Sequence, residues 1–157
     1  MVEQTTYRWV TAGILTLVLV LIGVVLYING GFGLDSSSSA RTVVEEFGMQ
    51  MQTVALLDAN ASSTMASAYG SLVTSDLLQR WQEDPENAPG RLTSSPYPDH
   101  IEIVTIEKQG RGYIVQGEVV MMASTGESGR TPVILQVIPE NGRWLIAVYQ
   151  EPNVGEE

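Results

Sequence analysis

The fold is decided by residues 101–150, which read IEIVTIEKQGRGYIVQGEVVMMASTGESGRTPVILQVIPENGRWLIAVYQ. Four segments rich in Ile, Val and aromatic residues are typical of strands, and turn sequences separate them. QGRG at 109–112 and PENG at 139–142 are tight turns in which glycine supplies a positive φ, and 124–130 is a longer hairpin loop. The short connections predict an antiparallel meander of four strands. These strands are Ile101–Glu107, Tyr113–Ser124, Thr131–Pro139 and Arg143–Gln150.

Both faces of the predicted sheet are apolar. Side chains alternate between the two faces of a strand, so Val133 and Leu135 lie on one face and Ile134 and Ile138 on the other. In an antiparallel sheet, the face that no helix covers is usually polar. We therefore expect the second face to be closed by curvature of the sheet, covered by residues 84–100, or used to bind a partner.

The region before the strands, about residues 40–84, is predicted to form three helices. SST at 62–64 is expected to cap a second helix that runs through Tyr69 to Val73, and Thr74 or Ser75 to cap a third. The third helix is predicted to bury Leu77, Leu78 and Trp81. The first helix is predicted from apolar residues that recur every three or four positions: Val43, Phe47, Met51 and Val54.

The segment between helices and strands, 84–100, reads DPENAPGRLTSSPYPDH. Its four prolines exclude a helix, because proline lacks the backbone N–H that a helix needs. We expect an ordered loop or an extended segment.

A membrane span is predicted at residues 10–28, VTAGILTLVLVLIGVVLYI, which carry no charge. A helix of this length spans roughly 28 Å, close to the thickness of the hydrocarbon core. Tyr7, Trp9 and Tyr27 flank it as membrane-interface anchors. A cleaved signal peptide is the main alternative, but its apolar region would be shorter, and LYINGGFGLD offers no small-residue cleavage site.

The charges next to the span predict its orientation. Arg8 and the terminal amine lie before it, whereas the first charge after it is Asp35, so the N-terminus is expected in the cytoplasm. We predict a single-pass protein of the bacterial cytoplasmic membrane with its C-terminal domain outside. The predicted parts are a cytoplasmic tail (1–9), a transmembrane helix (10–28), a Gly/Ser linker (29–40), an extracytoplasmic α+β domain (41–151) and an acidic C-terminal tail (152–157).

The composition excludes several functions. The 157 residues hold 8 Lys+Arg against 18 Asp+Glu, for a net charge of −10, with one His and no Cys. Nucleic acid is excluded as a partner because phosphate binding needs clustered basic residues. A thiolate metal site and a cysteine nucleophile are impossible, and a multi-histidine metal site is excluded. We expect neither a metal nor a cofactor.

The candidate for acid–base chemistry is the pair Asp99 and His100. Adjacent residues that enter a strand are expected to point to opposite faces, so the pair should not line one cavity. One imidazole with Asp99 and Glu102 is also a poor metal set. We therefore predict that the protein is not an enzyme.

Five residues are the candidates for a groove or a partner contact. Aromatic residues dominate interfaces as well as cores, and methionine adapts to irregular surfaces, so core packing is the alternative role for each. The candidates are Trp81, Tyr97, Met122, Trp144 and Tyr149.

The order of elements, with helices ending in AYGSLVTSDLLQRW (68–81) and a meander ending in GRWLIAVYQEP (142–152), resembles the nuclear-transport-factor-2-like superfamily, an α+β cone also called cystatin-like. The resemblance covers roughly residues 40–151 and implies three helices packed on a curved four-stranded antiparallel sheet. With its span and linker, the chain is similar in layout to the bitopic assembly subunit of type IV secretion and conjugation systems. Residues 81–103 also resemble a block in uncharacterised bacterial membrane-anchored proteins.

This superfamily hosts enzymes, ligand binders and scaffolds, so the fold alone does not assign a function. We expect a protein-binding or assembly module of the cell envelope, of the kind used in a secretion or conjugation-like machine. Its partners would be the lipid bilayer, envelope proteins and, weakly, a second copy of itself. The alternative is a small-ligand-binding or enzymatic domain that uses the cone interior. That alternative requires an open cavity of about 300 Å³ or more with converging polar groups.

Overall fold

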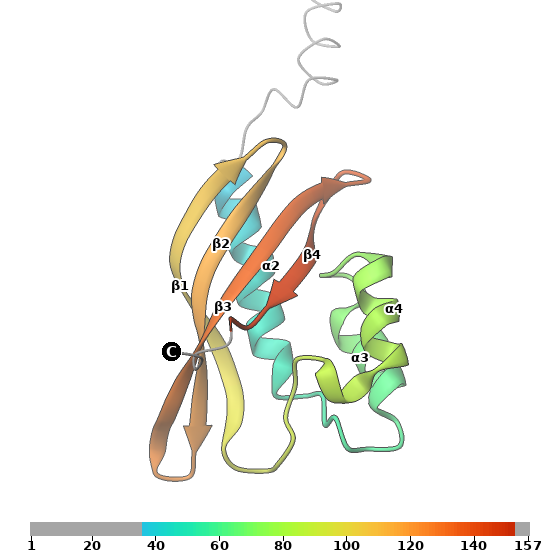
Figure 1. Cartoon of the computed structure of the whole chain (residues 1–157), viewed down its shortest axis with the longest axis vertical. Coiled ribbons are helices and arrows are strands. Elements are labelled where there is room, and N and C mark those ends of the chain that lie inside the picture. The colour runs from blue at the N-terminus through green and yellow to red at the C-terminus, as the bar shows by residue number, and fades with distance from the viewer. Residues whose placement is uncertain (1–35, 153–157) are drawn as a thin grey trace, which may run out of the picture. The chain divides into compact units, whose positions relative to one another are not determined.

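The computed structural model describes residues 36–152. Within this range no helix is both long and apolar enough to span a membrane. The predicted tail 1–9, the span 10–28 with its anchors Tyr7, Trp9 and Tyr27, and residues 153–157 lie outside the described residues. The elements follow the predicted order (Figure 1): α2 (Ser36–Met51), α3 (Ala61–Tyr69), α4 (Ser75–Glu83), the short 3₁₀ helix η1 (Pro85–Asn87), β1 (Tyr97–Gln109), β2 (Gly112–Ala123), β3 (Gly126–Glu140) and β4 (Arg143–Gln150).

The four strands form one antiparallel sheet in the order β1-β2-β3-β4, which confirms the predicted meander. Both tight turns use glycine at positive φ, 59° at Gly110 and 76° at Gly142. Strand β3 begins five residues before the predicted Thr131, because Ala123 pairs with Gly126 across the hairpin. Most of the predicted loop 124–130 is therefore strand.

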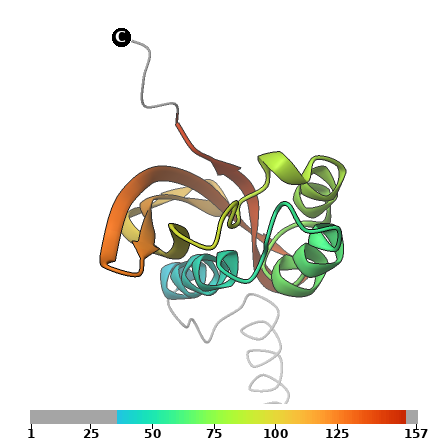
Figure 2. The same ribbon diagram turned by 90° about the horizontal axis from the view of Figure 1, so that it is seen from below.

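Helix α2 packs against one face of the sheet, here called the near face. Figure 2 shows the sheet curving around α2, with α3 and α4 beside it at the β4 edge. Val44 and Phe47 on the helix, and Val115 and Leu135 on the sheet, are fully buried in one core. Gly48 allows the close approach of α2 to β1, because a Cβ there would lie 2.6 Å from the backbone N of Ile101.

The first helix begins earlier than predicted. Residues 36–40, assigned to the Gly/Ser linker 29–40, form the first turns of α2. Ala40 is fully buried there, and Thr42 Oγ1 donates a hydrogen bond to the carbonyl of Ser38 at 3.0 Å. Burial of Ala40 against the core extends the helix into a stretch whose composition alone indicates a flexible linker.

The second helix starts at Ala61 and ends at Tyr69, so the sequence SST lies inside it rather than capping it. The chain leaves the helix before the predicted end at Val73 because it pairs with the edge of β4. Ile146 N donates to Leu72 O, and Thr74 N donates to Ile146 O, each at 2.9 Å.

The third helix agrees with the prediction at its start. Thr74 is its N-cap, and Thr74 Oγ1 accepts a hydrogen bond from Leu77 N at 3.4 Å. Leu77 and Trp81 are buried, whereas Leu78, also predicted to be buried, is half-buried against the core.

The first part of the proline-rich segment, 84–96, lies on the helix side of the sheet, whereas residues 97–100 form the start of β1, four residues before the predicted Ile101. Arg91 N donates to Val54 O at 2.9 Å, and Leu56 N donates to Arg91 O at 3.0 Å, which ties the segment to the chain that follows α2. Tyr69 Oη donates to Pro89 O at 2.7 Å. The segment therefore does not cover the other face of the sheet, here called the far face.

The far face is a mixture of apolar and charged side chains. Ile114, Ile134 and Ile138 are half-buried there, and Val148 is 38% exposed. Beside them Arg130 forms ion pairs with three carboxylates, which keeps part of this face hydrated. These are Glu102, Glu118 at 3.1 Å and Glu127 at 2.7 Å.

Candidate functional site

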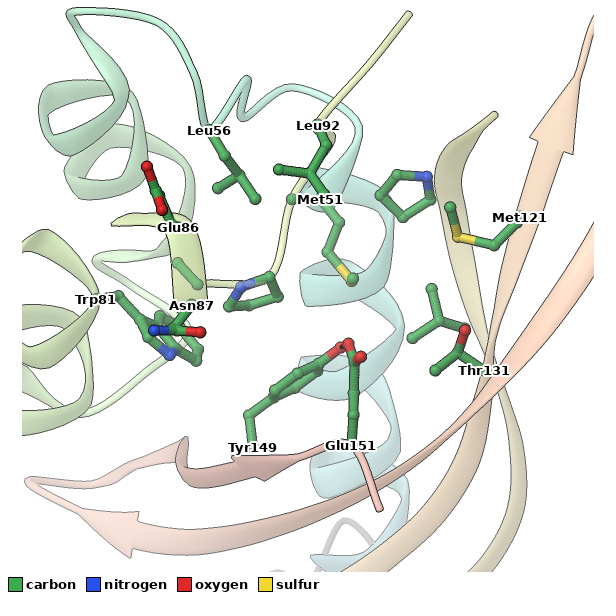
Figure 3. A pocket seen from close by; sticks show the side chains of 15 residues that line it. Met51, Leu56, Trp81, Glu86, Asn87, Leu92, Met121, Thr131, Tyr149 and Glu151 are labelled. Carbon is green, nitrogen blue, oxygen red and sulfur yellow. Dashed lines mark hydrogen bonds between the residues drawn. The ribbon is translucent and has the colours of Figure 1, made fainter. Parts of the chain in front are cut away.

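A cavity of about 420 Å³ opens on the near face, beyond the C-terminal end of α2. Met51 of α2 and Trp81 of α4 form part of its wall, and the proline-rich segment contributes Glu86–Gly90 and Leu92. Leu56 comes from the chain that follows α2, and the sheet contributes the rest (Figure 3): Pro98, Val119, Met121, Thr131, Tyr149 and, just after β4, Glu151. The cavity exists because α2 ends at Met51, while the curved sheet continues past it.

The inner wall of this pocket is apolar and firmly packed. Met51, Leu56, Trp81 and Val119 are all buried core residues that also line the cavity. Methionine is a flexible and polarisable side chain, so Met51 and Met121 can adapt to the shape of a bound molecule.

An aromatic cluster supports the pocket from behind. Phe47 lies at the centre of the cluster, with ring centroids 4.9 Å from Tyr69, 5.9 Å from Trp81 and 5.8 Å from Tyr149. Burial raises the pKa of the Tyr69 phenol well above its usual value, so it remains the donor of the hydrogen bond to Pro89 O. This bond holds the proline-rich wall against the core.

The polar groups of the pocket lie near its opening. Tyr149 Oη donates to Glu151 Oε1 at 2.6 Å, and burial raises the Tyr149 pKa well above its usual value. Glu86 and Asn87 come from η1, where Asn87 Nδ2 donates to Asp84 Oδ2 at 2.7 Å. Among the described residues that line the pocket, the charged side chains are two carboxylates, Glu86 and Glu151, and none is basic.

The structure separates the five candidate contact residues. Trp81 and Tyr149 line the pocket, with ring centroids 6.0 Å apart. Tyr97 and Met122 are paired neighbours on β1 and β2 and do not line it. Trp144 packs against Tyr113, at 5.4 Å between ring centroids, elsewhere in the fold.

The side chains of Asp99 and His100 do not point to opposite faces as expected. The β1–β2 register shifts between Pro98 and His100, so Asp99 occupies a bulge instead of alternating with His100. The two side chains therefore meet, with His100 Nδ1 2.8 Å from Asp99 Oδ2. Neither residue lines the pocket.

Sequence reasoning did not single out several lining residues. Met51 was assigned to the core stripe of the first helix, which it also belongs to, and Glu151 was placed only as the last residue of the domain. One signal was present. The proline-rich segment is ordered, apolar in part and too long for a simple connection, which is typical of a segment that forms the wall of a site.

Comparisons with known proteins identify no family for this chain. No family model matches the chain, and no curated protein matches it. One solved structure, of a designed nuclear-transport-factor-2-like protein, is similar to this chain with a TM-score of 0.42 and 14% sequence identity. The alignment covers 75% of this chain and 100% of the designed protein. The three helices and the four-stranded antiparallel meander fit a nuclear-transport-factor-2-like α+β fold.

Proposed function

We propose that the α+β domain binds a small molecule with apolar and polar parts in the pocket of the near face. The observation that carries this proposal is the cavity of about 420 Å³. Small-molecule sites occupy about 300–1,000 Å³, so this volume is sufficient for the ligand-binding alternative considered in the sequence analysis. The alternative function named from the sequence is therefore the one that the geometry favours.

The character of the walls supports binding over catalysis. The inner wall is buried and apolar, and the exposed polar side chains of Glu86, Asn87 and Glu151 complete the lining. A ligand site likewise combines apolar walls with polar groups that fix the orientation of the ligand. Asp99 and His100, the acid–base pair considered from the sequence, lie outside the set of lining residues. We therefore keep the prediction that the protein is not an enzyme.

Methionine methyl NMR of the full-length chain in phosphatidylcholine nanodiscs tests the proposal. Met51 and Met121 line the pocket, whereas Met65 is a core residue and Met122 does not line it. A water-soluble apolar probe, 2-phenylethanol, is expected to shift the Met51 and Met121 signals and to leave the other two in place. Met121→Trp should fill the pocket and abolish this response, and Met122→Trp is the matched control. Equal shifts of all four signals would contradict the proposal.

A second candidate function is the assembly module named first from the sequence. The far face supports it, because its half-buried isoleucines and exposed Val148 remain uncovered by the segment 84–100. A weak contact becomes effective when both partners are held at one membrane. The partner would be an envelope protein or a second copy of this chain.

The proposal includes a place in the cell. An uncharged stretch at 10–28 supports a single membrane span, and the layout resembles the bitopic assembly subunits of secretion and conjugation machines. We place the domain on the outer side of a bacterial cytoplasmic membrane. Protease added to intact spheroplasts should then digest the domain, and its protection would contradict this orientation.

A further inference from the structure

We infer that the ligand of this pocket is a small cation with an apolar body, of the alkylammonium or arylalkylammonium class. The inference rests on the proposed binding function and adds the sign of the ligand's charge. The ammonium group would lie at Glu151, and the apolar body would lie along Met51 and Val119.

The charged residues of the pocket lining indicate the sign of the ligand's charge. Glu86 and Glu151 carry the charges of the described lining residues, and the lining holds no Lys or Arg to balance them. Arg80, Arg91 and Arg130 each adjoin a lining residue in sequence, but none of the three is itself part of the lining. An anionic ligand would meet two like charges at the opening, whereas a cation is attracted to them.

The position of Glu151 makes it the anchor for the positive group. Its carboxylate accepts a hydrogen bond from the Tyr149 hydroxyl, with 2.6 Å between the two oxygens, which fixes the carboxylate at the pocket. A carboxylate has about four acceptor positions, so this bond leaves others for an ammonium donor. Figure 3 shows Tyr149 and Glu151 meeting across the pocket from Leu56 and Leu92. The side of the cavity with Tyr149 and Glu151 is thus polar and anionic, and the opposite side is aliphatic apart from Glu86.

The aromatic rings of the lining favour the same ligand. Trp81 and Tyr149 stand nearly perpendicular, with an angle of 82° between their planes. The negative face of an aromatic ring attracts a cation, most strongly for tryptophan. Met51 and Met121 add polarisable sulfur beside the apolar body.

Three probes that share a phenylalkyl body and differ in the head group test the inference. They are 2-phenylethylammonium, 2-phenylethanol and 3-phenylpropanoate, each titrated into the full-length chain in phosphatidylcholine nanodiscs. The Met51 and Met121 methyl signals report occupancy of the pocket. We expect the ammonium probe to bind about tenfold more tightly than the alcohol, the size of one charged hydrogen bond, and the carboxylate probe to bind weakest.

The variant Glu151→Gln keeps the shape of the side chain and removes its charge. It should lower the affinity for 2-phenylethylammonium to that for 2-phenylethanol, and leave the affinity for the alcohol unchanged. Glu107→Gln removes an exposed carboxylate of β1 outside the pocket and is the matched control, for which the tenfold preference should persist.

The outcomes separate the inference from the function on which it rests. Equal affinity for the three probes, or a preference that survives Glu151→Gln, would overturn the inference and leave the binding function standing. Failure of all three probes to shift Met51 and Met121 would overturn the binding function as well.

Discussion

The two faces of the sheet are similarly apolar in sequence but differ in what covers them. On the near face Val115, Leu135 and Val137 are fully buried beneath α2. On the far face Ile134 and Ile138, from the same strand, are only half-buried. Burial is thus set by the packing of α2 and by the curvature of the sheet, which alternation of apolar residues does not encode. The near face also opens into a pocket where α2 ends, so the face that α2 covers provides the cavity.

The largest expected effect is a difference in the stability lost when a residue of the near face or of the far face is replaced. Leu135→Ala should lower the free energy of unfolding by about 3 kcal/mol, because it leaves a cavity in a fully buried site. Ile134→Ala, one position along the same strand, should cost about 1 kcal/mol. Urea titration of the full-length chain measures both, and equal losses would remove the distinction between the faces.

The proline-rich wall of the pocket is held against the core by one buried hydrogen bond, from Tyr69 Oη to Pro89 O. Tyr69→Phe removes the donor to Pro89 O and leaves that carbonyl buried, so the free energy of unfolding should fall by about 1–2 kcal/mol. Amide hydrogen exchange at Gly90 and Arg91 should also become faster. Unchanged exchange there would show that the bond does not hold the proline-rich segment.

Alkaline pH should lower the free energy of unfolding through two buried tyrosines of the pocket region, Tyr69 and Tyr149. Burial raises the pKa of Tyr69 and Tyr149 above the usual value of about 10, so above that pH the unfolded chain loses phenolic protons that the folded chain keeps. The stability that these groups contribute is complete below pH ~10 and falls as the pH rises further. Tyr149→Phe should flatten this dependence in urea titrations from pH 9 to 11. An identical slope in the variant would contradict the assignment.

The smallest effect concerns the far face. Val148→Lys should reduce the concentration-dependent self-association of the full-length chain, since it places a charge in the exposed apolar part of that face. Leu57→Lys, a change at a more exposed site outside the sheet, is the control. Sedimentation equilibrium measures both variants. A wild-type chain that stays monomeric at every concentration would leave an unrelated protein as the partner.

The sequence predicts the local features of this fold well. Period-two alternation and the two glycine turns are enough to predict the meander, and Thr74, one of the two caps predicted for the third helix, marks the start of that helix. Features that depend on distant contacts were missed: burial of Ala40 extended the first helix, and pairing with β4 shortened the second.

The candidate site was predictable only in part, for the same reason. Trp81 and Tyr149 are large aromatic residues and stood out, and both line the pocket. Met51 and Glu151 become site residues because of where α2 and β4 end in space, about which their local sequence carries no signal. The meeting of Asp99 and His100 depends on a bulge, which alternation along a strand does not predict.

The most direct test of the central claim is an intermolecular NOE experiment on the full-length chain with 2-phenylethylammonium. The account predicts NOEs from the aromatic protons of the probe to the methyl groups of Met51 and Met121, and none to the methyl group of Met122. NOEs to Met122 in place of Met51 and Met121 would place the ligand outside the near-face pocket and contradict the account.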